Sequence, residues 1–164
     1  MNRNFLRTCA AFFLALAGIS AVPAFAESEI EGTWRLVMRE LPDGKKITPP
    51  GVLGLASWVK GNLNFNVVWR TPDGKLASSS TLSTYKFTDN EFSETLLFQR
   101  LVDPSQPHGG ALSTSAETKS TPLDRGNGGL RFKLPFDPPV LEVQGDKMTA
   151  TADGLFVDHW ERIR

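Results

Sequence analysis

Cysteine is almost absent from the sequence. The single Cys, Cys9, lies in an apolar segment near the N-terminus, so the chain can form neither a disulfide of its own nor a Cys-ligated metal site. Histidine is also scarce, since only His108 and His159 are present, and a zinc or haem site would have to be completed by several carboxylates. We therefore expect no metal, no cofactor, and a fold held by an ordinary hydrophobic core.

Neither sign of charge is in excess. The 164 residues include 18 Lys and Arg and 18 Asp and Glu, which gives a formal net charge of zero at pH 7. A basic patch, the usual signature of nucleic-acid binding, is not visible, and a near-neutral surface has no strong attraction for anionic lipid head groups. With 40% hydrophobic and 22% charged residues, the composition fits a single globular domain with no nucleic-acid partner.

The common catalytic motifs are also missing. The sequence contains no Gly-x-Ser-x-Gly, no His-Glu-x-x-His and no phosphate-binding Gly-Lys loop. Asp158 and His159 are adjacent and invite an acid–base interpretation. Neighbouring residues of a strand point to opposite faces, however, so Asp158 cannot orient His159. We predict no catalytic residue, and an enzyme is the least favoured functional class.

The N-terminus has the pattern of a secretory signal peptide. Arg3 and Arg7 precede an apolar run over residues 9–22, and residues 23–26 end in an Ala-x-Ala sequence. The run is shorter than the roughly 20 residues that cross a bilayer as a helix. We therefore predict cleavage after Ala26 and export of residues 27–164, to the periplasm or the medium, with no membrane-spanning segment in the mature chain.

The remaining chain reads as short strands joined by tight turns. The clearest period of two is in residues 62–70, where Leu63, Phe65 and Val67 alternate with Asn residues. Further strands are predicted at 32–40, 52–59, 76–87, 91–101, 130–136, 140–144, 147–152 and 155–163, and no helix is predicted among them. Residues 102–129, rich in Ser, Thr, Pro and Gly, are expected to form a long flexible loop with at most one weak strand near 111–119.

These elements predict an all-β fold. Eight to ten sequential strands with short connections favour an antiparallel up-and-down barrel that closes on itself, because closure removes exposed sheet edges. The alternative is a two-sheet sandwich, which needs long crossing connections, and only residues 102–129 could supply one.

Three segments carry a resemblance to a known family. Residues 30–36, Ile-Glu-Gly-Thr-Trp-Arg-Leu, and the closing segments 145–149 and 158–162 resemble bacterial lipocalin-like domains, which form calycin-type β-barrels. The resemblance implies that Trp34 packs at the closed end of the barrel under Arg162. Trp160 shares a strand face with Arg162 and is assigned to the same structural clamp. Many secreted lipocalins have a disulfide and a C-terminal helix, and neither is present here.

A barrel of this size can leave room for one small ligand. The residues expected to line such a pocket are Trp58, Phe65, Trp69, Tyr85, Phe87, Phe132 and His159. The predicted function is binding of a small lipophilic molecule. Three alternatives stay open: a barrel packed solid by its own aromatic residues, a polar ligand bound by Asn62, Asn64 and Asn66, and an envelope protein-binding or inhibitor module whose protein partner is unknown.

Overall fold

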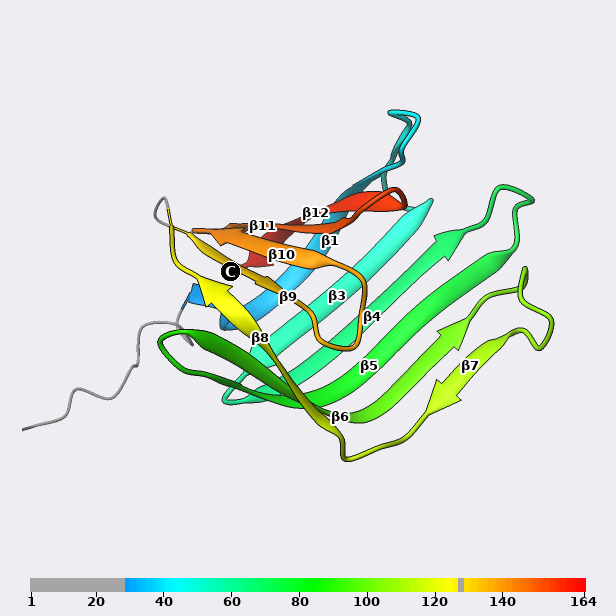
Figure 1. Ribbon diagram of the computed structural model, residues 1–164. Helices are drawn as coiled ribbons and strands as arrows, with labels where there is room; N and C mark the ends of the chain where they lie inside the picture. The colour runs from blue at the N-terminus through cyan, green and yellow to red at the C-terminus, as the bar shows by residue number, and fades with distance from the viewer. Residues whose placement is uncertain (1–28, 127–128) are drawn as a thin grey trace, which may run out of the picture.

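The structure, a computed structural model, describes residues 29–126 and 129–164 (Figure 1). The predicted signal peptide, residues 1–26, lies outside the described residues. The strands are β1 (Gly32–Glu40), β2 (Lys46–Ile47), β3 (Val52–Val59), β4 (Asn62–Arg70), β5 (Leu76–Phe87), β6 (Glu91–Val102), β7 (Gly110–Ser113), β8 (Thr118–Asp124), β9 (Leu130–Lys133), β10 (Val140–Gln144), β11 (Lys147–Ala152) and β12 (Phe156–Ile163). In this part of the chain, no helix is both long and apolar enough to cross a lipid bilayer.

These strands form one antiparallel sheet that closes on itself. β1 pairs with β3 on one side and with β12 on the other, so the first and last strands are neighbours. The closed ring has ten strands in the order β1-β3-β4-β5-β6-β8-β9-β10-β11-β12, while β2 and β7 add to β1 and β6 outside it. The predicted all-β, up-and-down barrel is confirmed, and the two-sheet sandwich is excluded for the described residues.

The turns between strands lie at two opposite ends of the barrel. The end that contains Trp34 is formed by the turns at 60–61, 88–90 and 145–146; we call it the closed end. The other is formed by the turns at 42–45, 71–75, 103–109, 134–139 and 153–155; we call it the open end. The long strands, such as β4, β5 and β6, thus contribute side chains to both ends, whereas β2 and β7 lie at the open end only.

The described part of the predicted loop, residues 102–126 and 129, is more regular than the sequence predicts. β7 pairs with the last part of β6, from Gln99 to Val102, and β8 pairs with its first part, from Glu91 to Thr95. β8 then continues onto β9 and so becomes a strand of the closed ring. Its Ser, Thr and Lys side chains are mostly exposed, and a strand without an apolar face gives no period-two hydrophobic signal.

The alternation in β4 holds in the structure. Leu63 and Val67 are buried in the barrel, at 3% and 1% exposure, whereas Asn62, Asn64 and Asn66 are exposed on the outer face. Burying the apolar stripe and leaving the amides in water is the arrangement that the hydrophobic effect favours. The alternative of a polar ligand held by these Asn residues therefore does not fit the structure.

An aromatic cluster fills the interior toward the closed end. It consists of Trp58, Tyr85, Phe87, Phe92 and Phe132, whose neighbouring ring centroids lie 4.4–6.5 Å apart. Most pairs are edge-on or tilted, as aromatic quadrupoles prefer. These rings, supplied by β3, β5, β6 and β9, close the barrel from within.

The clamp that the resemblance implied is formed by Trp34 and Arg162. Trp34 is fully buried, and its Nε1 donates to the Ile30 carbonyl at 2.8 Å. The Arg162 guanidinium carbon lies 4.2 Å from the indole centroid, while its Nη2 donates to the carbonyls of Glu29 and Gly145 at 2.6 and 3.1 Å. The pairing of β1 with β12 places Arg162 directly opposite Trp34 in the sheet.

Candidate functional site

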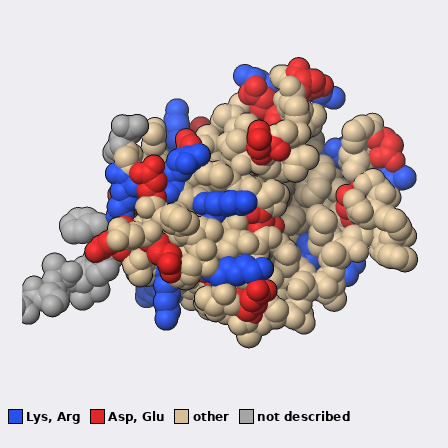
Figure 2. Space-filling model, in the orientation of Figure 1, with Lys and Arg blue, Asp and Glu red and all other residues tan. Residues whose placement is uncertain are grey.

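The open end leads into a cavity of about 1290 Å³ inside the barrel. Its rim is built from the surrounding turns and includes Lys45, Lys46, Thr71, Pro72, Asp73, Asp103, Ser105, Pro138 and Leu155. Figure 2 shows the molecular surface hollowed between the β1–β2 turn and the β4–β5 and β6–β7 turns. The interior is therefore not packed solid by its own aromatic residues; they fill only the closed end.

The cavity exists because small side chains replace aromatic ones along the same strands. β5 points Ser79 and Thr81 inward at the open end, but Tyr85 and Phe87 at the closed end. β3 likewise places Ala56 in the cavity wall, one inward position before the bulky Trp58. In β3 and β5, small inward-facing residues therefore leave space at the open end, and aromatic residues fill the closed end.

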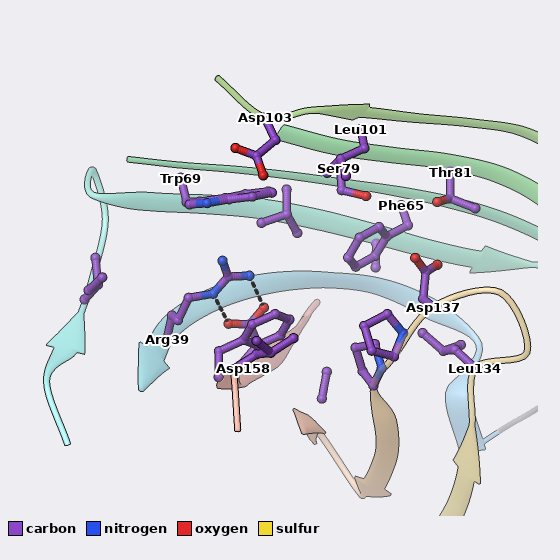
Figure 3. Close-up of a pocket in the computed structure, with 18 of the residues that line it drawn as sticks. Arg39, Phe65, Trp69, Ser79, Thr81, Leu101, Asp103, Leu134, Asp137 and Asp158 are labelled. Atoms are coloured by element: carbon purple, nitrogen blue, oxygen red, sulfur yellow. Dashed lines mark hydrogen bonds and ion pairs between the residues drawn. The ribbon is translucent and has the colours of Figure 1, made fainter. Parts of the chain in front are cut away.

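The middle of the cavity is apolar. Phe65 and Trp69 of β4 lie along one wall (Figure 3), and Trp160 of β12 meets Phe65 with ring centroids 5.6 Å apart. Gly54 of β3 permits this arrangement, because a Cβ atom there would stand 2.8 Å from the Trp160 ring and 2.9 Å from Leu36 Cβ. Leu134, Leu141, Met148 and Phe156 complete the apolar lining.

A buried ion pair lies at one side of the cavity (Figure 3). Arg39 of β1 donates from Nε and Nη2 to the two carboxylate oxygens of Asp158 of β12, at 2.6 and 2.7 Å. The guanidinium also lies 5.2 Å from the ring centroid of Trp69 and 4.1 Å from that of Phe156. Burial raises the pKa of Asp158, and the hydrogen bonds and charge of Arg39 oppose that rise.

A β-bulge brings Arg39 to the inside. The pairing of β1 with β12 shifts between Leu36 and Met38, and the residue opposite Asp158 becomes Arg39, which is 6% exposed. A strict alternation would have placed Met38 inside with Trp34 and Leu36, as the sequence pattern suggests. An extra residue in one strand moves every later side chain to the opposite face.

A second polar group of residues lies on the other side of the cavity. The carboxylate of Asp137, from the β9–β10 turn, accepts a hydrogen bond of 2.8 Å from Gln99 Nε2 of β6. Thr81 lies nearby on the same part of the wall (Figure 3), is only 3% exposed, and its hydroxyl has no hydrogen-bond partner. Burial raises the pKa of Asp137, and the hydrogen bond from Gln99 opposes part of that rise.

Glu94 and Ser83 lie in the barrel wall beside this group. Glu94 is 1% exposed, and neither of its carboxylate oxygens meets a donor in hydrogen-bonding geometry. Burial raises the pKa of Glu94 to about 7; the neighbouring Ser83 hydroxyl opposes this rise, and the charge of Asp137 adds to it. Buried polar atoms without partners are rare in folded proteins and call for an explanation.

The structure brings together only part of the predicted pocket lining. Trp58, Phe65 and Trp69 line the cavity, and so does Trp160, which was assigned to the clamp. Tyr85, Phe87 and Phe132 are placed elsewhere, in the aromatic cluster of the closed end. His159 is not a lining residue either, because Asp158 and Trp160 on each side of it point inward and it points away.

The polar residues of the cavity were missed by sequence reasoning. A signal existed for Glu94, which stands between Phe92 and Leu96 on the apolar face of β6, where a charged residue is unusual. No sequence pattern indicated that Arg39 points inward, because the direction of its side chain depends on the bulge in β1. Asp137 lies in a Pro-rich turn, so no periodicity indicates where its side chain points.

Among residues 29–126 and 129–164, no group of three or more His, Asp or Glu side chains is placed to hold a metal ion.

Few known proteins are similar to this chain. Neither a protein-family model nor a curated protein matches the sequence. One solved structure is similar, that of a lipocalin-like protein from Bacteroides uniformis: it shares 15% sequence identity, and the match covers 82% of this chain and 99% of that chain with a TM-score of 0.36.

The chain's own topology defines the fold. Ten antiparallel strands follow the chain order around the ring, and the first strand pairs with the last. A Trp of the first strand lies under an Arg of the last at one end, and the other end opens into an apolar interior. The described residues therefore form a closed, antiparallel up-and-down β-barrel, with the Trp–Arg contact that the resemblance to lipocalin-like domains implied.

Proposed function

We propose that the protein binds a small lipophilic molecule in the barrel cavity. The observation that carries this proposal is a hollow of about 1290 Å³ that is closed by aromatic packing at one end and accessible at the other. Clefts of this kind, mostly apolar with a few convergent polar groups, are the usual sites for small ligands.

The physical gain comes from removing apolar ligand surface from water. Each buried CH₂ group contributes about 0.8 kcal/mol, and the walls offer Phe65, Trp69 and Trp160 as broad contact surfaces. Because the barrel already holds these rings in place around the cavity, a ligand has little protein reorganisation to drive. The cavity thus favours an elongated or fused-ring apolar molecule over a small polar metabolite.

A matched pair of variants tests the proposal. Ser79 points into the cavity from β5, and the next residue, Ser80, points outward from the same strand. Ser79→Phe fills cavity space and is expected to weaken binding of the neutral fluorescent probe N-phenyl-1-naphthylamine by at least tenfold, whereas Ser80→Phe leaves it unchanged. Saturable binding of one probe per chain is expected in the wild type. Unsaturable binding by every apolar probe class, or equal effects of the two substitutions, contradicts the proposal.

Native mass spectrometry of the protein purified from its own host gives an independent test. A non-covalent small mass that is lost on gentle activation supports the ligand-binding function, and its loss in Ser79→Phe assigns it to the cavity. A stoichiometric protein partner with an empty cavity favours the protein-binding class instead.

Export is the second part of the proposed function. It is supported by the signal-peptide pattern of residues 1–26. Cell fractionation followed by intact mass measurement is expected to recover a chain that begins at Glu27, outside the cytoplasm. A cytoplasmic protein that retains residues 1–26 contradicts this part and leaves ligand binding untouched.

A further inference from the structure

The cavity has an acidic side that no protein cation neutralises. Asp137 lines it and accepts one hydrogen bond, from the neutral side chain of Gln99. Glu94 lies in the wall behind, fully buried, with both oxygens lacking a donor in hydrogen-bonding geometry. A buried carboxylate without a cation is costly, and it normally persists only where function requires it.

Among the described residues, none of the cations that line the cavity forms an ion pair with Asp137 or Glu94. Arg39 binds both oxygens of Asp158 on the opposite side of the cavity (Figure 3), so its charge is cancelled there. Arg70 donates to the Gly74 carbonyl within its own turn at 3.0 Å. Lys45 and Lys46 lie on the rim, and Lys46 pairs with Glu40 at 3.8 Å. The described interior therefore carries an uncompensated negative charge beside Asp137.

The same side also has a vacant hydrogen-bonding position. Thr81 lines the cavity at 3% exposure, and its Oγ1 has no partner. Figure 3 shows Thr81 and Asp137 on either side of the space next to Phe65. An unpartnered hydroxyl, a carboxylate with spare acceptor capacity and an aromatic ring thus surround one point in the cavity, and a donor placed there satisfies them together.

We propose that the lipophilic ligand carries a protonated amine, which docks between Asp137 and Thr81 while its apolar part lies along Phe65, Trp69 and Trp160. This inference rests on the proposed function and specifies its ligand class. An ammonium group supplies both the donors and the charge that this side of the cavity lacks, and charge-assisted hydrogen bonds are about twice as strong as hydrogen bonds between neutral groups. A carboxylate ligand meets like charge at the same point and is disfavoured.

The raised pKa values of Asp137 and Glu94 agree with this assignment. Both describe carboxyls that are poorly stabilised in their charged form in the ligand-free protein, because burial removes water and no cation replaces it. A bound ammonium group is the kind of counter-charge that would favour their ionised forms.

Three probes with the same chain and different head groups test the proposal at pH 7.5: decylammonium and decanoate below their micelle concentrations, and decanol below its solubility limit. Isothermal titration is expected to show decylammonium bound at least tenfold more tightly than decanol, with decanoate weakest. Asp137→Asn keeps an acceptor for Gln99 and is expected to remove most of the amine's advantage while leaving decanol affinity unchanged.

Asp103→Asn is the matched control. Asp103 also lies on the cavity rim, but its carboxylate already accepts hydrogen bonds from Ser105 and Gln106, so amine affinity is expected not to change. If Asp137→Asn does not fold, Glu94→Gln is the second variant, with an expected loss of about threefold in amine preference. An unchanged preference in that variant overturns the proposal.

The two levels of the proposal fail in different ways. If decanol binds in the cavity but decylammonium shows no advantage, or if decanoate binds most tightly, the amine assignment is wrong and the lipophilic-ligand function stands. If none of the three probes binds, and N-phenyl-1-naphthylamine does not bind either, the proposed function itself fails.

Discussion

The two ends of the barrel are built from the same strands but satisfy different demands. At the closed end, Trp34 and Arg162 stack on each other and their nitrogens donate to backbone carbonyls. At the open end, the hydroxyl of Thr81 is buried in the cavity wall without a hydrogen-bond partner, and the carboxylate of Asp137 accepts a single hydrogen bond, from Gln99. The first arrangement lowers the free energy of the folded chain, and the second raises it. Binding sites commonly carry such a cost, because groups that await a ligand are unsatisfied without it.

The open end is nevertheless not simply loose. Arg39 is held by Asp158 and lies between Trp69 and Phe156. A buried ion pair is weak evidence for stability, because desolvation offsets its Coulomb energy. Its bidentate geometry does fix the direction of the neighbouring rings. The contrast is therefore between the clamp, whose nitrogens donate to backbone carbonyls, and the cavity wall, where Thr81 and Asp137 keep spare hydrogen-bonding capacity.

The largest expected effect contrasts two Trp residues. Trp34→Ala removes a fully buried indole from the closed end and is expected to lower the free energy of unfolding by about 3–5 kcal/mol, through lost burial and the void left behind. Trp69, half-buried beside the cavity, loses less contact on truncation, so Trp69→Ala is expected to cost about 1–2 kcal/mol. Urea unfolding of both variants measures the difference. Equal losses would show that the two ends do not differ in packing.

The next effect concerns the unsatisfied carboxyl of Glu94. Its pKa rises from an ordinary value of 4.5 to about 7 in the folded protein. The folded state therefore binds the proton more tightly, and the contribution of Glu94 to stability is fully present below pH 4.5 and is lost as the pH rises to 7. The loss amounts to at most about 3 kcal/mol. Glu94→Gln is accordingly expected to be more stable than the wild type at pH 8 and nearly unchanged at pH 4.

Glu91→Gln provides the control for this pH dependence. Glu91 belongs to the same strand but is exposed, so its replacement is expected to change the unfolding free energy by less than about 0.5 kcal/mol at either pH. A Glu94→Gln variant that parallels the wild type from pH 4 to pH 8 would show that the buried carboxyl is not perturbed as described. Chemical unfolding at four or five pH values is sufficient.

The fold could be predicted because its main signal is local. Alternation in β4 and the turns around Gly44, Gly74 and Gly145 depend on neighbouring residues only, and a series of such strands with short connections leaves few topologies. β8 escaped this reasoning, because its side chains are mostly polar on both faces. Its strand conformation comes from pairing with β6 and β9, which a local pattern does not encode.

Which residues line the cavity was harder to predict from the sequence than where the strands lie. Aromatic residues on predicted strands were expected to line a pocket, but the level of each residue along the barrel axis decides whether it fills the closed end or lines the cavity. Phe65 and Phe87 are both aromatic residues on predicted strands. Phe65 lines the cavity and Phe87 packs in the closed-end cluster, because they lie at different levels along the barrel axis. Fixing it requires the register of every strand pair, and a single bulge, as at Leu36–Met38, changes the register.

A smaller effect is expected where the two regions meet, at Gly54. A Cβ atom there would lie 2.8 Å from the Trp160 ring and 2.9 Å from Leu36 Cβ, so Gly54→Ala forces the ring away from β3. We expect a loss of about 1–3 kcal/mol, as for other overpacking substitutions, together with a change in tryptophan emission. Ser57→Ala, on the outer-facing side of the same strand, is the control and is expected to change neither. An unshifted emission spectrum in Gly54→Ala would show that the ring does not lie against this strand.

The last and smallest effect tests the clamp itself. Arg162→Ala removes a guanidinium that stacks 4.2 Å from the Trp34 centroid and donates to the carbonyls of Glu29 and Gly145. A loss of about 1–2 kcal/mol is expected, since a partly desolvated cation–π contact contributes roughly 1 kcal/mol. Arg162 Nε also pairs with Asp146 at 3.2 Å. Arg164→Ala is the control, because Arg164 pairs with the same carboxylate but is largely exposed. In the Trp34→Ala background the cost of Arg162→Ala should shrink by about 1 kcal/mol, as it does for residues in contact. Strict additivity would mean that the two side chains do not stabilise each other, and the closed end would then owe its stability to the aromatic cluster alone.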